Sequence, residues 1–137
     1  MNVVEKARAL RELIKNASQK DEDKTLVIGL CKYFETWKKG AYNVGDVRLH
    51  PRTKAPYECI LAHDSTSNPT WDISVRTLWK PYHSRKKEFA LPWEQPTGSH
   101  DMYKVGEYMI WTDGNIYCCL LDTNYSPTEY AQAWEVV

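Results

Sequence analysis

Net charge and long apolar runs are what this 137-residue sequence lacks. Its 18 basic and 18 acidic residues cancel, and a net charge of zero argues against an electrostatic nucleic-acid binder, which normally shows a clustered basic excess. No apolar run approaches the roughly 18–20 residues that span a bilayer. The charged start MNVVEKARALRELIK has no signal-peptide apolar core. We therefore expect no nucleic-acid partner, no membrane association, and synthesis in the cytoplasm without a signal peptide.

The four cysteines lack the spacing of a metal site. None of them forms a C-x-x-C pair. Adjacent Cys118 and Cys119 would point to opposite faces of a strand, which argues against a disulfide between them. We expect no bound metal. The three cysteines of the 36–137 region are interpreted as small buried apolar residues or idle thiols.

Motifs of common enzymes are also missing. The sequence has no G-x-S-x-G, no H-E-x-x-H and no phosphate-binding glycine-rich loop. His63-Asp64-Ser65 and His100-Asp101 are neighbours in sequence, which does not provide the relay geometry of a catalytic triad. Their histidines more often hold a loop through hydrogen bonds. We expect neither a cofactor nor catalytic activity.

Phenylalanine is scarce, whereas other aromatic residues are abundant. The chain has two Phe but six Trp and nine Tyr. Trp and Tyr combine an apolar face with a polar group and suit surfaces that are partly wet. The composition favours a binding surface, although small β domains also fill their cores with Trp.

The first 35 residues have a helical pattern. Val3, Ala7, Leu10, Ile14 and Ala17 alternate steps of four and three, as along an a/d seam. After a polar break at 21–23, KTLVIGLCKYF continues a helical pattern to about Phe34. These features predict an N-terminal helical hairpin over 1–35. Either it packs on its own domain, or its seam forms a homo-oligomer, for which a trimer is one possibility.

The remaining chain contains an internal repeat. YNVGD at 42–46 recurs as YKVGE at 103–107, and eight landmarks follow in the same order in each copy. They are Trp37, Gly40, Tyr42, Gly45-Asp46, Tyr57, Cys59, Pro69 and Trp79, then Trp93, Gly98, Tyr103, Gly106-Glu107, Tyr117, Cys119, Pro127 and Trp134. The short β-rich runs between turn residues predict two small antiparallel β modules, one of which includes a two-residue hairpin turn at Asp113-Gly114. The predicted class is thus α+β, with modules at 36–81 and 93–137 joined by a linker at 82–92.

The first repeat contains the motifs W-K-K-G-A-Y-N-V-G-D-V, P-Y-E-C-I-L-A-H-D-S, P-T-W and L-W. With these motifs it resembles carbohydrate-binding module families 5 and 12, which are small β modules that bind chitin and other polysaccharides. In those families a loop Trp often precedes a Pro, whereas here Pro69 precedes Trp71.

The second repeat opens with W-E-Q-P-T-G-S-H-D-M-Y-K-V-G and later contains D-T-N-Y-S-P. It is similar to a variant of this module found in bacteriophage and prophage proteins, in which the second motif lies in the binding-loop region. A helical leader followed by two modules is similar to small proteins encoded among phage tail and lysis genes. The resemblance implies a non-catalytic virion protein, made in the host cytoplasm, that attaches to host-surface or environmental polysaccharide, including cell-wall glycan. An alternative is a structural virion protein, such as a head fibre, decoration or baseplate component, that uses the fold to bind other virion proteins.

Six residues are candidates for carbohydrate binding. Sugar rings are recognised by exposed aromatic faces together with nearby polar side chains. The candidates are Trp71, Tyr125, Tyr130, Trp111, His63 and Asn124. Trp71 lies in the polar loop DSTSNPTWDIS, and Tyr125 in DTNYSP is interpreted as its counterpart in the second repeat. Each can instead be a structural residue, and Trp111, beside a hairpin turn, can equally contact a protein.

Four tryptophans at the repeat boundaries are predicted to be core residues. They are Trp37, Trp79, Trp93 and Trp134. Modules of about 40 residues bury little surface, so large aromatic side chains must supply much of the core. Gly45 and Gly106 are expected in turns with positive φ. Asp46 and Glu107 are interpreted as local turn acids.

Overall fold

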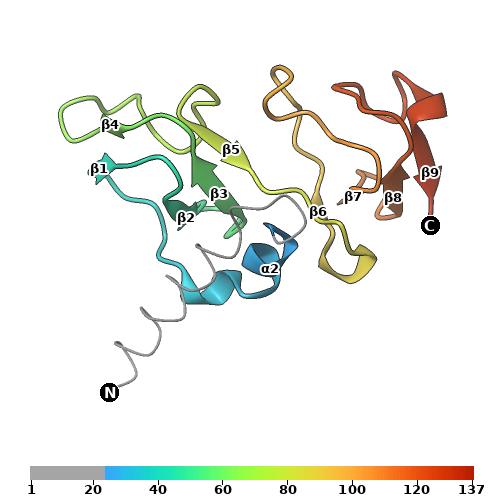
Figure 1. The fold of residues 1–137 in the computed structure, drawn as a ribbon, viewed down its shortest axis with the longest axis horizontal. Helices are drawn as coiled ribbons and strands as arrows, with labels where there is room; N and C mark the ends of the chain where they lie inside the picture. The colour runs from blue at the N-terminus through green and yellow to red at the C-terminus, as the bar shows by residue number, and fades with distance from the viewer. Residues whose placement is uncertain (1–23) are drawn as a thin grey trace. The chain divides into compact units, whose positions relative to one another are not determined.

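The computed structural model describes residues 24–137, which form two compact units that divide between Tyr82 and His83 (Figure 1). Short β-strands are the main elements of both. Within residues 24–137, no helix is long and apolar enough to cross a membrane.

The predicted α+β class with an N-terminal helical hairpin is wrong. The described residues form three β-sheets and one short α-helix, α2 (Lys24–Gly29). The helix predicted to reach Phe34 ends at Gly29, because glycine is a poor helix former, and Leu30 then leaves helical geometry with φ −115° and ψ 21°. A short 3-10 helix, Cys31–Tyr33, follows. The helix predicted over 3–18, with its oligomer seam, lies outside the described residues.

Unit 1 contains two antiparallel sheets. One pairs β1 (Ala41–Tyr42) with β4 (His63–Asp64), and the other has the order β2 (Val47–Leu49), β3 (Pro56–Cys59) and β5 (Trp79–Pro81). Its core consists of Tyr42, Tyr57, Cys59, Ile73, Leu78 and Trp79, with Trp37 packed against it. Side chains alternate between faces along a strand, so β2 also buries Val47 and Leu49 on either side of half-buried Arg48.

Unit 2 contains one four-stranded sheet. Its order is β6 (Leu91–Pro92), β7 (Tyr108–Ile110), β8 (Ile116–Cys119) and β9 (Trp134–Val136), with only the β6–β7 pair parallel. Two 3-10 helices, Lys87–Phe89 and Ala131–Ala133, lie along the chain. The core consists of Tyr103, Met109, Cys119, Ala133 and Trp134. Part of the segment 82–92, predicted as a linker, belongs to this unit through β6 and a bridge between Ser84 and Tyr108.

The sequence repeat is also a structural repeat. Gly45 and Gly106 have φ of 94° and 88°, which confirms the predicted positive-φ turns. Each donates its backbone N–H over 2.9 Å to the carbonyl of the equivalent cysteine, Cys59 or Cys119. Both cysteines are buried, as predicted. A side chain at this turn position would be strained, so both copies retain glycine.

Each core has the same Tyr–Trp contact. The Tyr42 and Trp79 rings meet edge to face at 5.0 Å and 74°, and the Tyr103 and Trp134 rings meet at 5.3 Å and 71°. The two tryptophans pair across the sheet with the two buried cysteines. Edge-to-face packing is a favourable geometry for aromatic pairs. The predicted core positions of Trp79 and Trp134 are confirmed.

Candidate functional site

Two of the Trp and Tyr side chains within residues 24–137 are clearly exposed. Trp71 exposes 41% of its surface and Tyr125 exposes 57%. The other aromatic residues of these two types are buried or half-buried. Exposed aromatic faces on loops are the feature that the sequence predicted for a carbohydrate site.

Trp71 closes a turn that begins at Asn68. Its backbone N–H donates to the carbonyl of Asn68 over 2.9 Å, and the N–H of Asn68 donates to the carbonyl of Ser65 over 3.0 Å. The buried Ser65 hydroxyl donates to the carbonyl of Gly40 at 3.1 Å and accepts the Gly40 N–H at 3.1 Å. Consecutive turns fixed at a buried serine hold the exposed indole on a defined backbone.

Two acidic residues shape the same loop. Asp64 accepts the backbone N–H of Thr66 over 2.9 Å, and hydrogen bonds from the side chain and then the backbone of Thr66 lower the pKa of Asp64. Beside the indole, Asp72 accepts the N–H of Ser74 over 2.8 Å and also its hydroxyl. Both carboxylates serve as turn acceptors, an Asx-type role that rigidifies a loop.

Tyr125 stands on a loop fixed to the core of unit 2. Its N–H donates to the Thr123 hydroxyl over 2.9 Å, and its carbonyl accepts the indole N–H of Trp134 over 2.9 Å. Nearby, Asp122 accepts the N–H of Val105 over 2.9 Å. The ring is exposed, while its backbone is held from several directions.

Asn124 lies beside Tyr125 and offers a polar group. Its carbonyl accepts the side-chain N–H of the exposed Gln95 over 2.9 Å. Its side-chain oxygen is buried and has no hydrogen-bond partner within the described chain. Sequence reasoning missed Gln95, although the quoted motif W-E-Q-P contains it. Two side-chain amides therefore lie at the Tyr125 loop. Asn124 directly precedes Tyr125 in the chain, and Gln95 is joined to the loop by its hydrogen bond to Asn124.

Trp71 and Tyr125 are not structural counterparts. Each repeat has a turn that contains its proline. In the first repeat, the backbone N–H of Trp71 donates to the carbonyl of Asn68 over 2.9 Å. In the second, the backbone N–H of Glu129 donates to the carbonyl of Ser126 over 3.1 Å. Glu129 therefore takes the turn position of Trp71, while Tyr125 precedes its turn. The interpretation of the two aromatic residues as equivalent was wrong, because the two loops differ in length.

Tyr130 and Trp111 are less exposed than Tyr125. Both are half-buried and pack against its core. The Trp111 ring meets the Trp93 ring edge to face at 5.5 Å. Trp111 also flanks the hairpin turn, whose Thr112–Gly114 segment has three residues instead of the predicted two. Trp111 and Tyr130 therefore pack against the core of unit 2. A role of either residue in sugar binding stays a prediction.

His63 has a structural environment. Its Nδ1 lies 2.7 Å from the carbonyl oxygen of Leu61, so Nδ1 carries the proton because a carbonyl can only accept. Its ring packs 5.9 Å from Tyr42 and 5.9 Å from Trp79. The histidine ties its loop to the aromatic core, which is the alternative that the sequence left open.

The described residues contain little that suggests metal or thiol chemistry. No group of three or more His, Cys, Asp or Glu within 24–137 is arranged to hold a metal ion. All four cysteines are free thiols.

No protein-family model matches the chain, and no curated protein matches it at a significant level. The similarity to carbohydrate-binding modules therefore stays a prediction from motifs.

Proposed function

We propose that the protein is a non-catalytic carbohydrate-binding protein of a phage or prophage particle. It attaches to host-surface or environmental polysaccharide through aromatic side chains on the loops of two small β modules. The observation that carries this proposal is the selective exposure of Trp71 and Tyr125, because the structure buries or half-buries the other Trp and Tyr residues of 24–137.

The geometry of both loops suits recognition of a sugar ring. A flat aromatic face can cover the C–H face of a pyranose, and the exposed side-chain amide of Gln95 can hydrogen-bond to its hydroxyl groups. The hydrogen bonds beneath Trp71 and Tyr125 hold their backbone before a ligand arrives. Pre-organisation lowers the ordering cost of binding. Several weak sites on one particle would raise the avidity without new contacts.

A structural role in the virion is the second candidate, and one observation favours it. Both repeats expose an aliphatic pair at equivalent positions, Val44 with Leu61 and Val105 with Leu121. Sugars make little use of such side chains, whereas protein partners bury them. Under this alternative, the modules would contact other virion proteins.

The test is binding of the purified full chain to chitin, peptidoglycan and host cell-wall polysaccharide. Trp71→Ala and Tyr125→Ala should each weaken binding about fivefold to thirtyfold, because truncating a central aromatic contact costs about 1–2 kcal/mol. Phe89→Ala is the matched control, since Phe89 is an exposed aromatic residue outside both loops. Circular dichroism checks that each variant is folded.

The outcomes separate the two candidates. Loss of binding in a folded loop variant, with Phe89→Ala unchanged, supports carbohydrate binding. The absence of binding to all these glycans, together with stable oligomers that dissociate when Val44 and Val105 are changed to Ser, would support the structural role.

A further inference from the structure

The hairpin that joins β2 to β3 in unit 1 is rich in basic residues. Its sequence VRLHPRTKAPY, residues 47–57, contains two arginines, one lysine and one histidine but no acid. The equivalent hairpin of unit 2, YMIWTDGNIY at 108–117, contains one acid and no Lys or Arg. The same scaffold therefore presents opposite charge in its two copies.

Lys54 occupies a backbone position that favours glycine. Its φ is 63°, and within residues 24–137 it is the one non-glycine residue with positive φ. It lies just before Ala55, whose carbonyl accepts the N–H of His50 over 2.8 Å. In unit 2, Gly114 has φ 84° and the same place in the hairpin. A lysine is sterically less favourable there than a glycine, so the backbone does not explain why a lysine is present.

Two further arginines and a histidine lie at the same hairpin. Arg48 pairs across the sheet with Tyr57, and the Arg76 guanidinium carbon lies 5.7 Å from the centre of the Tyr57 ring. The His50 ring lies 5.8 Å from that ring. Arg48, His50 and Arg76 are half-buried, while Arg52 in the turn is exposed. The Arg48 guanidinium carbon lies 5.2 Å from the centre of the Tyr42 ring, so each half-buried arginine is held over an aromatic ring. Stacking of this kind pre-organises a guanidinium for binding an anion.

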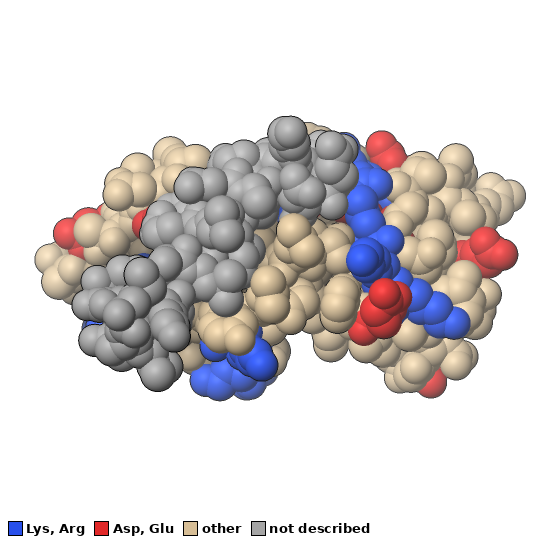
Figure 2. All heavy atoms as spheres, turned by 60° about the horizontal axis from the view of Figure 1, so that its bottom comes forward, with Lys and Arg blue, Asp and Glu red and all other residues tan. Residues whose placement is uncertain are grey.

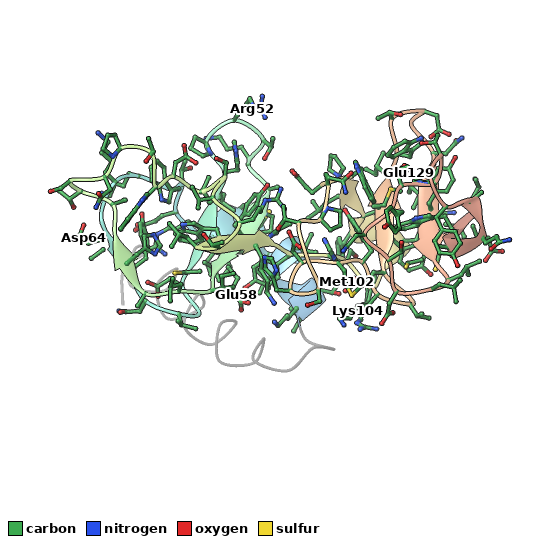
Figure 3. The ribbon with its side chains drawn as sticks, turned by 90° about the horizontal axis from the view of Figure 1, so that it is seen from above. Arg52, Glu58, Asp64, Met102, Lys104 and Glu129 are labelled. Carbon is green, nitrogen blue, oxygen red and sulfur yellow. The ribbon has the colours of Figure 1, made fainter. Side chains whose placement is uncertain are left out.

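The nearest acid of these strands faces the other way. Glu58 alternates with Tyr57 along β3 and therefore points to the opposite face. There it pairs with Lys24 at 3.5 Å and with Lys80 at 3.7 Å. Figure 3 shows Arg52 and Glu58 on opposite sides of the unit 1 sheet. Within the described residues, neither Arg52 nor Lys54 forms an ion pair.

Charge is also unequal between the two units. Basic residues outnumber acidic ones in 24–82, whereas acidic residues outnumber basic ones in 83–137. On the face shown in Figure 2, basic side chains gather in groups, and the larger group has acidic side chains beside it. A protein with zero net charge can therefore still present a local positive field to a polyanion.

We propose that this basic hairpin binds the anionic groups of a polysaccharide. The proposed site consists of Arg48, Arg52 and Lys54 on the hairpin together with Arg76 beside it. His50 holds the turn, because its Nδ1 accepts the backbone N–H of Arg52 over 3.1 Å. The ligand is a glycan polymer that bears repeated phosphate or carboxylate groups. The arginine side chains bind these groups through paired N–H donors, and Lys54 contributes a point charge at the tip. The inference rests on the proposed carbohydrate-binding function and names its ligand class.

The experiment compares the affinity of the full chain for four probes. A phosphorylated mannan carries phosphate, polygalacturonate carries carboxylate, and chitin oligosaccharide is neutral. Oligothymidylate carries phosphate without being a polysaccharide. We expect at least one anionic glycan to bind more tightly than chitin oligosaccharide and to weaken as salt is raised, because salt screens exposed charges. The two anionic probes distinguish phosphate from carboxylate.

A charge-matched pair of variants locates the site. Arg52→Gln with Lys54→Gly removes two charges from the hairpin, and Lys38→Gln with Lys39→Gln removes two exposed charges elsewhere in unit 1. The first double variant should lose about tenfold or more in affinity for the anionic glycan, as expected for two charge-assisted contacts. It should keep its affinity for chitin oligosaccharide. The second should change both affinities less than about twofold, in line with unpaired surface charges.

Four results would overturn the inference. Equal losses in the two double variants would indicate non-specific attraction. Equal affinity for neutral and anionic glycans would remove the anion site but leave the proposed carbohydrate-binding function standing. Tighter binding of oligothymidylate, lost in the hairpin variant, would assign the hairpin to nucleic acid. Binding to none of the glycans would instead reject the proposed function as well.

Discussion

Trp134 donates its indole N–H to the carbonyl oxygen of Tyr125 over 2.9 Å. The bond connects the core of unit 2 to the backbone of its exposed aromatic residue. Trp134→Phe keeps an aromatic ring in the core but removes the donor. We expect this variant to weaken glycan binding, because the loop beneath Tyr125 loses an anchor, although the Tyr125 ring is unchanged. Titration calorimetry with the best glycan ligand measures this loss.

Unit 1 supplies the control for this prediction. Trp79 is the structural equivalent of Trp134, but its indole N–H is buried and has no hydrogen-bond partner within the described chain. Trp79→Phe makes the same change of volume without breaking a bond. Chemical denaturation should show Trp134→Phe to be less stable than Trp79→Phe by about 1 kcal/mol, the net value of a typical hydrogen bond. Equal destabilisation would show that the bond contributes nothing.

The hairpin glycine of unit 2 gives a test of backbone conformation alone. A methyl group on Gly114 would meet nothing within 4 Å, and the same holds for Gly40. Of these two glycines, only Gly114 has positive φ, at 84°. Gly114→Ala should therefore destabilise the protein by about 1 kcal/mol, whereas Gly40→Ala should be neutral or slightly stabilising. Thermal unfolding of the two variants checks this, and a neutral Gly114→Ala would contradict it.

Local chemistry explains which features could be predicted from the sequence. The YNVGD and YKVGE motifs predicted two related turns, because glycine readily adopts the positive φ that such a turn needs. Burial of Trp79 and Trp134 followed from the need of small modules for large core side chains. Asp46 and Glu107 each accept a backbone N–H three residues upstream at 2.8 Å, which confirms them as turn acids.

The features that sequence reasoning missed depend on longer-range geometry. The apolar pattern of KTLVIGLCKYF predicted a helix to Phe34, but Gly29 ends α2, and Phe34 is buried in an extended conformation instead. Trp71 and Tyr125 were paired wrongly because the two loops differ in length. Matching the repeats by their shared residues does not align loops of unequal length. The positive φ of Lys54 has no sequence signal, because lysine normally avoids that conformation.

Asp101 should make the stability of unit 2 sensitive to acid. It is buried and accepts the backbone N–H groups of Thr97 and Gly98, each at 2.9 Å. Burial alone would raise the pKa of Asp101, but these hydrogen bonds outweigh it and lower the pKa below 3.8. A lowered folded-state pKa means that its stabilisation is present above about pH 4 and is lost as the pH falls through the folded value.

Asp101→Asn is the variant that tests this. It removes the charge while keeping a similar shape, and we expect it to lower the free energy of unfolding at pH 7 by about 2 kcal/mol, the range for hydrogen bonds to charged groups. The variant should also show a smaller loss of stability than the parent between pH 4 and pH 2, measured by urea denaturation at each pH. An unchanged acid profile would mean that other carboxylates dominate acid unfolding.

The adjacent thiols Cys118 and Cys119 should differ in reactivity although they share a strand. Cys119 is 1% exposed, and burial raises its pKa to about 12, whereas Cys118 is half-buried on the other face of β8. At pH 8, a thiol with a pKa of about 12 is ionised in about one molecule in ten thousand.

Iodoacetamide should therefore label native Cys118 well before Cys119, and tandem mass spectrometry of the single peptide that holds both will locate the label. Labelling at equal rates would require the β8–β9 pairing to open readily, because Cys119 lies opposite Trp134 in the core. The loop anchored by Trp134 would then also be less rigid than its hydrogen bond indicates.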